Sequence, residues 1–178
     1  MYDISIFETE LNSIGNVSIR DIVRDLLGKA PRYFWTVPAS SSGKYHPQYA
    51  LGDGGLVRHV KAAVKFANNL AVIYDFLPIE NDLAVAALLL HDLLKQGGDD
   101  EGCHTVFDHP LLAAAFIEEQ APKAFSRLVA PLVRTHMGQW TTSKYAPGVV
   151  LPKPSTALEK FVHECDYLAS RKDFEVRL

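Results

Sequence analysis

Cysteine is scarce in this 178-residue chain, and long hydrophobic stretches are absent. The two cysteines, Cys103 and Cys165, lack the C-x-x-C spacing of a zinc ribbon or a dithiol redox motif, so we expect two reduced thiols. The longest uninterrupted apolar run, Leu83 to Leu90, is too short to cross a bilayer. The opening residues MYDISIFETE lack the basic and apolar regions of a signal peptide. These features predict a soluble, cytoplasmic protein that does not contact a membrane.

The chain also lacks any run of basic residues. Its 18 Lys and Arg and 21 Asp and Glu give a net charge of -3 and a pI near 6.1. Because electrostatic binding to duplex nucleic acid needs a basic surface, we expect no duplex partner. A small anionic substrate held by a few local cations fits this charge. No internal repeat or low-complexity segment is present, and the 48% hydrophobic content suits one globular domain over residues 1–178.

Helical periodicity dominates the chain, and no convincing alternating strand pattern is present. Ser18 and Asp21 resemble a capping box at the start of the first main helix, and Gly28 suits its end. The third main helix should be central, because it is apolar on nearly all sides. The sequence predicts an all-α protein, a compact bundle of about six main helices with long irregular loops. The predicted helices cover approximately residues 18–28, 55–74, 79–95, 109–120, 123–137 and 155–171.

Two of the loops are long, residues 31–55 and 139–154, and both are rich in aromatic residues and Lys. Ordered loops of this length are uncommon in compact domains and often serve a function. They suit a segment that covers a substrate. Plain connecting polypeptide with surface aromatics is the alternative, and the sequence alone does not separate the two.

His91 and Asp92 interrupt the apolar third helix near its end. An ionised carboxylate in such a place costs free energy unless it is paired or bound to a metal, and a buried imidazole also needs partners. A metal cation satisfies both, since His and Asp are favoured ligands. This pair therefore indicates a metal site.

Four further residues occupy inward or terminal helix positions from which they could converge on this pair: His59, His109, His136 and Asp166. A single His on an apolar face is more often a hydrogen-bonded core residue than a ligand. The ordered set, taken with the adjacent His-Asp pair, favours one polar cluster inside the bundle. Helical bundles build metal sites in this way, from side chains on facing helices.

The ordered pattern H…HD…D resembles the HD-domain superfamily of metal-dependent phosphohydrolases. LLLHDLLKQG resembles the HDIGK end of the family's central helix, and ECDYLASRKDF resembles the segment that carries the last Asp. KYHPQYALGDGGLVRHV is similar to the entry into the first His helix. The resemblance covers about residues 54–172 and implies an HD-like helical bundle, with residues 1–53 packed on it.

The resemblance also implies a ligand set and a cofactor. It implies divalent transition metal ions, two per chain and drawn from Fe, Mn, Co, Ni, Zn or Mg. The residues that would hold the first ion are His59, His91, Asp92 and Asp166. The residues that would hold the second ion are His109 and His136, with Asp92 bridging the two ions. The sequence lacks the paired His and the GYP segment of HD-GYP domains, so cyclic di-GMP is not a favoured substrate.

The expected activity is hydrolysis of a phosphate ester of a nucleotide or short oligonucleotide, with a metal-activated water or hydroxide as nucleophile. Asp92 and Lys95 are the expected catalytic residues. Lys95 lies one turn past His91 and in the family commonly faces substrate phosphate; the alternative is a Lys that only balances the helix dipole. Arg58 and His46 are weaker candidates for substrate contact. The expected partner is thus a small phosphorylated substrate, and the oligomeric state is open.

Two other functions remain compatible with the same residues. A di-iron oxygenase on the HD scaffold would use an identical ligand set. A non-catalytic nucleotide-binding HD domain would be expected to lack some ligands, whereas here all are present. The remaining histidines, His104 and His163, are expected to be structural.

Overall fold

The computed structural model describes residues 3–41, 43, 46–98 and 104–178. These residues form seven α-helices and four short 3-10 helices, and no strand occurs among them. The all-α prediction is confirmed, and the six longer helices correspond to those predicted. Cys103 and residues 42, 44 and 45 of the first long loop lie outside the described residues. The α-helices are α1 Glu8–Asn12, α2 Val17–Gly28, α3 Gly55–Leu70, α4 Pro78–Leu90, α5 His109–Gln120, α6 Lys123–Arg134 and α7 Ala157–Ala169.

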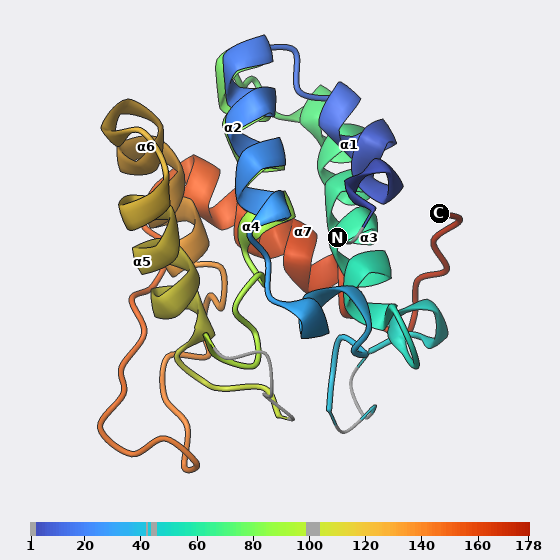
Figure 1. Cartoon of the computed structure of the whole chain (residues 1–178), viewed down its shortest axis with the longest axis vertical. Helices are drawn as coiled ribbons and strands as arrows, with labels where there is room; N and C mark the ends of the chain where they lie inside the picture. Colours follow the sequence, from blue (N-terminus) through green and yellow to red (C-terminus); the bar gives the residue numbers. More distant parts are fainter. Residues whose placement is uncertain (1–2, 42, 44–45, 99–103) are drawn as a thin grey trace.

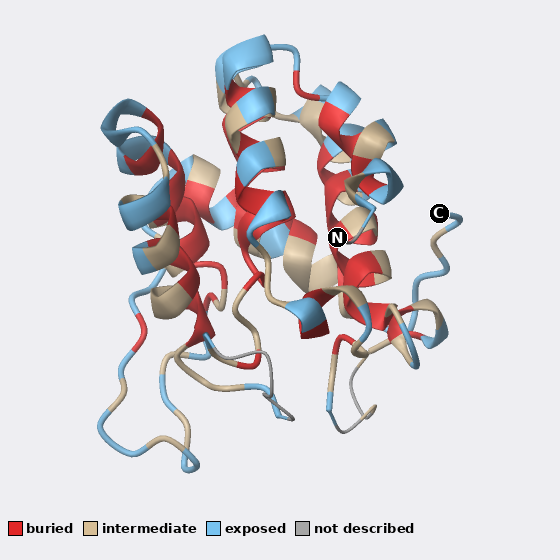
Figure 2. Cartoon of the chain, viewed as in Figure 1, coloured by how far each residue is buried: buried red, intermediate tan, exposed pale blue. Residues whose placement is uncertain are grey.

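Helix α4 lies at the centre of the bundle, as its apolar sequence predicts. It packs against α2, α3, α6 and α7, and every residue from Leu83 to Leu90 is buried. Around it, α5 and α6 form an antiparallel pair on one side, α1 and α3 lie on the other, and α7 crosses the bundle (Figure 1). One continuous hydrophobic cluster includes residues from all seven α-helices. Burial is therefore concentrated on the helix faces that point inward (Figure 2).

The start of α2 differs from the predicted capping box. Asn16, not Ser18, caps the helix: its side chain accepts a hydrogen bond from the Ile19 amide at 3.1 Å. The buried Asp82 of α4 accepts hydrogen bonds from the amides of Gly15 and Asn16, both at 2.8 Å. This long-range contact fixes the helix cap two residues earlier than the local pattern indicates.

The third predicted helix ends earlier than expected, at Leu90 instead of residue 95. The following residues form tighter turns, in which the amide of Leu93 donates to Leu90 and that of Lys95 donates to Asp92. The Tyr33 hydroxyl donates to the main-chain oxygen of Gly97 at 2.7 Å and accepts from the Gln96 amide at 3.1 Å. Tyr33, in the 3-10 helix Arg32–Trp35, thus holds this turn from a distant part of the chain.

Two other predicted helices are also shorter than expected. Helix α3 ends at Leu70 and continues as the 3-10 helix Ala71–Ile73, and α6 ends at Arg134 before a turn that contains His136. Thr156 and Glu159 form the capping box of α7. Two 3-10 helices complete the fold, Ile4–Phe7 before α1 and Gln48–Ala50 before α3.

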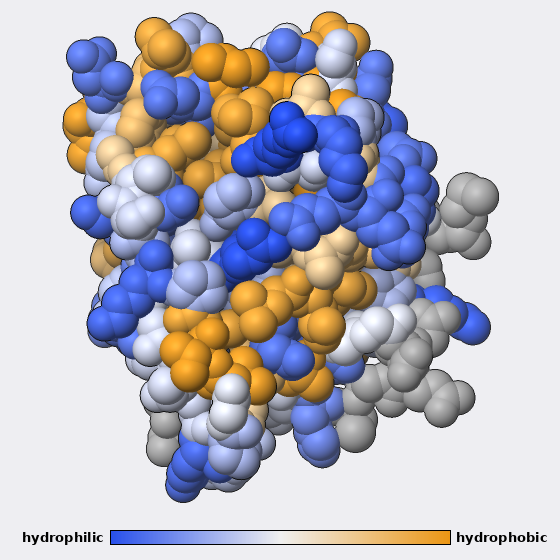
Figure 3. All heavy atoms as spheres, turned by 90° about the vertical axis from the view of Figure 1, so that its left-hand side faces the viewer, coloured by the Kyte–Doolittle hydropathy of each residue, from blue (hydrophilic) through white to orange (hydrophobic). Residues whose placement is uncertain are grey.

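The long loops gather at one end of the bundle (Figure 1). On the side of the molecule where α5 and α6 lie, hydrophobic patches alternate with hydrophilic side chains (Figure 3). Within the described residues, no helix is both long and apolar enough to span a membrane.

Candidate metal centre

The six predicted ligands converge at the loop end of the bundle. They come from five different elements: His59 lies on α3, His91 and Asp92 follow α4, His109 begins α5, His136 follows α6 and Asp166 lies on α7. All are buried except Asp166, whose side chain is 16% exposed. The fold thus places one acid and imidazole cluster where five segments meet.

The first group of ligand atoms surrounds the Asp166 carboxylate. The Nε2 atom of His59 lies 2.9 Å from Asp166 Oδ1, and that of His91 lies 3.4 Å from the same oxygen. His91 Nε2 is also 3.3 Å from Asp92 Oδ2. One ligand atom from each of His59, His91 and Asp166 lies within 4.8 Å of the others, a spacing that a single cation can bridge.

The second group surrounds the other oxygen of Asp92. His109 Nε2 lies 3.2 Å from Asp92 Oδ1, and His136 Nε2 lies 3.7 Å from it. The two Nε2 atoms are 3.1 Å apart. His91, Asp92 and His136 also meet the 4.8 Å spacing. The two carboxylate oxygens of Asp92 therefore face two different sets of imidazoles.

Three of the histidines are oriented by main-chain carbonyl groups. In each, Nδ1 lies 2.7 Å from the oxygen of the residue three positions earlier, which can only accept a hydrogen bond: His91 on Leu88, His109 on Val106 and His136 on Val133. Nδ1 therefore carries a proton, and a neutral ring keeps its lone pair on Nε2. Metal-ligating histidines are commonly fixed by such a second hydrogen bond.

Several buried atoms at the centre lack the partner that a cation would supply. His91 Nε2 and Asp92 Oδ1 are buried and make no hydrogen bond. His109 and His136 present Nε2 atoms to one another although both Nδ1 atoms hold the proton, so two lone pairs meet unless a cation or an added proton separates them. Buried unsatisfied groups of this kind cost free energy. The residues present fit a divalent metal site.

The electrostatics of the pocket also favour positive charge. Burial disfavours an imidazolium at His91, but Asp92 and Asp166 outweigh it and raise the pKa of His91 to about 10. Burial would raise the pKa of Asp92, yet His91 and the Lys95 ammonium hold that pKa well below its usual value. Burial and the charge on His91 lower the pKa of His136 to about 3. The two carboxylates thus stabilise a positive charge at His91, and the same carboxylates would stabilise a bound cation.

A sequence model of the HD-domain family matches residues 56–171. The chain belongs to the HD-domain family. Comparison with curated proteins and with solved structures gives no match. HD domains are in general metal-dependent phosphohydrolases, so membership and the His/Asp cluster together indicate a divalent metal site and a hydrolase-type function. The predicted recognition of this family is confirmed.

A cleft of about 820 Å³ opens onto the metal centre of this HD domain. His109, His136 and Asp166 line its floor, and both long loops contribute to its walls. Residues 39–41 and His46 come from the first loop, and residues 140, 142, 143 and 145 come from the second. The prediction that these loops cover a substrate site fits this placement.

The three predicted substrate-contact residues lie in different surroundings. Lys95 lines the cleft and donates a short hydrogen bond to Asp92 Oδ2. His46 also lines it, and its buried Nδ1 makes no hydrogen bond. Arg58 does not line the cleft: its guanidinium donates to the main-chain oxygens of Tyr49 and, at 2.8 Å, Leu51. These contacts favour a role for Arg58 in holding the loop before α3.

The sequence analysis did not single out several residues of the cleft wall. Trp140, Tyr167 and Arg171 all line it. Tyr167 follows Asp166 directly on α7 and Arg171 lies two residues beyond the end of that helix, so neither has the three- or four-residue helical spacing from the ligand that would have indicated it. Trp140 is close in sequence to His136, but only the turn at Gly138 brings its ring to the cleft. His163 supports the same turn, since its Nδ1 lies 2.7 Å from the main-chain oxygen of His136.

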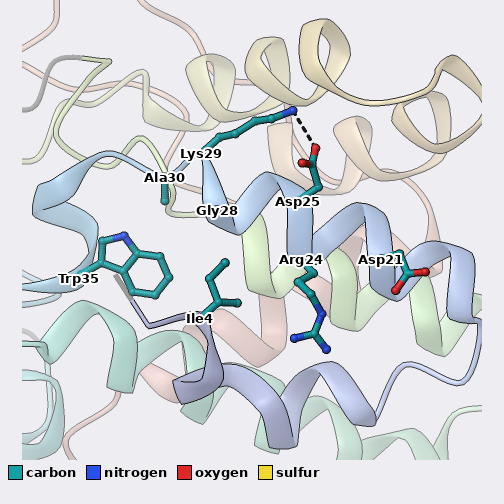
Figure 4. A pocket seen from close by; sticks show the side chains of 8 residues that line it. All are labelled: Ile4, Asp21, Arg24, Asp25, Gly28, Lys29, Ala30 and Trp35. Atoms are coloured by element: carbon teal, nitrogen blue, oxygen red, sulfur yellow. Dashed lines mark ion pairs between the residues drawn. The ribbon is translucent and has the colours of Figure 1, made fainter. Parts of the chain in front are cut away.

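A separate cavity of about 580 Å³ lies between α2 and the segment before α1 (Figure 4). Ile4 and Trp35 form its apolar side, and the Asp25 and Lys29 side chains pair at 2.7 Å on α2. None of the predicted ligands lines it. The predicted chemistry is therefore confined to the cleft at the loop end.

Proposed function

We propose that this HD domain hydrolyses a phosphate ester of a nucleotide or short oligonucleotide at a two-metal centre. His59, His91 and Asp166 would hold one ion and His109 and His136 the other, with Asp92 shared. The observation that carries the proposal is the position of Asp92, whose two oxygens face separate groups of imidazoles. If only one oxygen of Asp92 faced imidazoles, the geometry would not support a binuclear site.

Divalent cations at such a centre lower the pKa of a coordinated water toward neutrality and offset the charge of a phosphoryl group. The protein's own contribution is to position these groups. Five of the six side chains are buried, and three of the histidine rings are fixed by main-chain carbonyls, so the ligand atoms are held in place before substrate binds and less reorganisation is needed during the reaction. Asp92 is central to this arrangement because it contacts both ligand groups.

Lys95 and His46 would orient the phosphate. The Lys95 side chain is 12% exposed and lines the cleft beside Asp92, so a phosphate oxygen entering the cleft can share its ammonium group. Burial lowers the pKa of His46 to about 3, so this imidazole is neutral and offers a hydrogen bond without adding charge.

A panel of phosphomonoesters, cyclic nucleotides and short oligonucleotides, assayed with each candidate metal, tests the proposal. We expect His91→Ala and Asp92→Ala to abolish hydrolysis. His104→Ala is the matched control, because His104 lines the same cleft but is not one of the six predicted ligands. Undiminished hydrolysis in the His91 and Asp92 variants would remove this centre from consideration. Oxygen consumption by an iron-loaded protein that hydrolyses none of the esters would instead identify an oxygenase.

A further inference from the structure

Two aromatic rings form a stack on the wall of the cleft. The rings of Trp140 and Tyr167 lie 5.6 Å apart at an angle of 26°. Both residues line the cleft, yet 43% of Trp140 is exposed. A large aromatic side chain so exposed has ring surface available for a ligand. The stack extends the cleft wall beyond the residues needed for metal binding.

The stack is held rigidly to the elements that carry the metal ligands. Tyr167 follows Asp166 on α7, and Trp140 lies four residues after His136. The His163 ring packs edge-on against Trp140, with ring centroids 5.9 Å apart and an angle of 69°. His163 is itself fixed by the main-chain oxygen of His136. The orientation of the Trp140 ring is therefore coupled to that of the ligands.

Arg171 adds a donor to this wall. Its guanidinium carbon lies 4.6 Å from the centroid of the Tyr167 ring, a cation–π contact. Its Nε is buried and makes no hydrogen bond. Arg171 lines the cleft, so its guanidinium places N–H donors beside the space that a flat ring would occupy. The wall thus combines an exposed π face with a hydrogen-bond donor.

We infer that the Trp140–Tyr167 stack binds the base of a nucleotide substrate while the phosphate ester lies at the metal centre. This inference rests on the proposed function and deepens it by separating substrates that carry a base from those that do not. Stacking tolerates every base because each has a π face. The preferred substrates are therefore nucleotides as a class, with weak discrimination between purine and pyrimidine bases.

The test compares two phosphate esters that differ only in the base, a nucleoside 5′-monophosphate and ribose 5-phosphate. Trp140→Ala is expected to lower kcat/KM for the nucleotide by about 10- to 100-fold, the range associated with loss of one base–aromatic stack. Hydrolysis of ribose 5-phosphate should be unchanged. Trp140→Phe should restore most of the nucleotide activity. Thr141→Ala, in the same loop but outside the cleft lining, is the matched control.

A binding measurement gives a second readout that does not depend on turnover. A nucleotide with the fluorescent base 2-aminopurine is titrated into the protein in the presence of EDTA, and stacking on Trp140 should quench its emission. The quenching should disappear in Trp140→Ala and persist in Thr141→Ala. Equal losses of activity on both esters, or quenching that survives in Trp140→Ala, would overturn the inference. Failure to hydrolyse these two esters and every other phosphate ester of the panel, with quenching intact, would contradict the proposed function and leave the base site standing.

Discussion

Substitution of Gly138 by alanine tests whether His163 holds the predicted ligand His136 in position. The φ of Gly138 is +62°, in the left-handed region, and this glycine lies in the turn that carries His136. A Cβ atom built there would lie 2.2 Å from Cε1 of His163. The ring cannot remain in place, and it is the ring whose Nδ1 binds the main-chain oxygen of His136. Gly138→Ala should therefore disturb both the turn and the position of the His136 ligand.

The expected cost combines two effects. Left-handed backbone costs a residue other than glycine about 1–2 kcal/mol. Overpacking against the half-buried His163 ring adds about 1–3 kcal/mol. Gly138→Ala should thus lower the free energy of unfolding by roughly 2–5 kcal/mol. Urea denaturation of the metal-free protein measures this change.

Gly148→Ala provides the matched control. Gly148 also has a positive φ, +92°, but a Cβ there would meet nothing within 4 Å. This variant should show the backbone cost alone, about 1–2 kcal/mol, with its metal content unchanged. Metal content in Gly138→Ala should fall, because His136 loses its support. If the two variants are equally stable and retain equal amounts of metal, the proposed link between His163 and His136 is wrong.

Three further variants test other parts of the structure. Asp82→Ala removes two charge-assisted hydrogen bonds to the start of α2 and should cost about 3 kcal/mol in urea denaturation; a loss below about 1 kcal/mol would show that the turn holds without them. Burial raises the pKa of the Cys165 thiol, so in a Cys103→Ser background a thiol reagent should react only after unfolding, and rapid reaction of the native protein would contradict the packing. Lys95→Ala should lower hydrolysis while metal content stays the same, whereas loss of metal would assign Lys95 to the centre itself.

The core and the convergence of the His and Asp side chains could be predicted because each leaves a pattern in the sequence. The apolar run from Leu83 to Leu90 predicts a helix buried on all sides, and that helix is the centre of the bundle. His91 and Asp92 are conspicuous because charge at such a place requires compensation. The ordered set of histidines and aspartates then indicates the other ligands. Burial and charge cost identify the core and the His91–Asp92 pair, whereas the resemblance to HD domains was needed to assign the full ligand set.

The helix ends could not be predicted, because contacts from distant residues set them. Tyr33 holds the turn after α4 through Gln96 and Gly97, more than sixty residues further along the chain. Asp82 likewise fixes the start of α2, because its carboxylate accepts hydrogen bonds from two main-chain amides of the preceding turn. Helix α1 is only five residues long and has too few positions to show a clear period. Local sequence contains the propensity of each helix but not these tertiary partners.

The cleft wall was missed for a related reason. Trp140 and Tyr167 meet only because the turn at Gly138 and helix α7 bring them together. Arg58 is adjacent in sequence to the predicted ligand His59 and was therefore expected near substrate. Its guanidinium instead donates hydrogen bonds to the main-chain oxygens of Tyr49 and Leu51. Proximity in sequence to a metal ligand is therefore a weak guide to which side chains face the cleft.

The metal content of the purified protein tests the central claim most directly. Elemental analysis after reconstitution should find about two divalent ions per chain in the wild type and in His104→Ala. His109→Ala and His136→Ala should retain about one ion, because His59, His91 and Asp166 remain. Asp92→Ala should lose both, because it contacts both groups. One ion per chain in the wild type, unchanged in His109→Ala and His136→Ala, would contradict the two-metal centre.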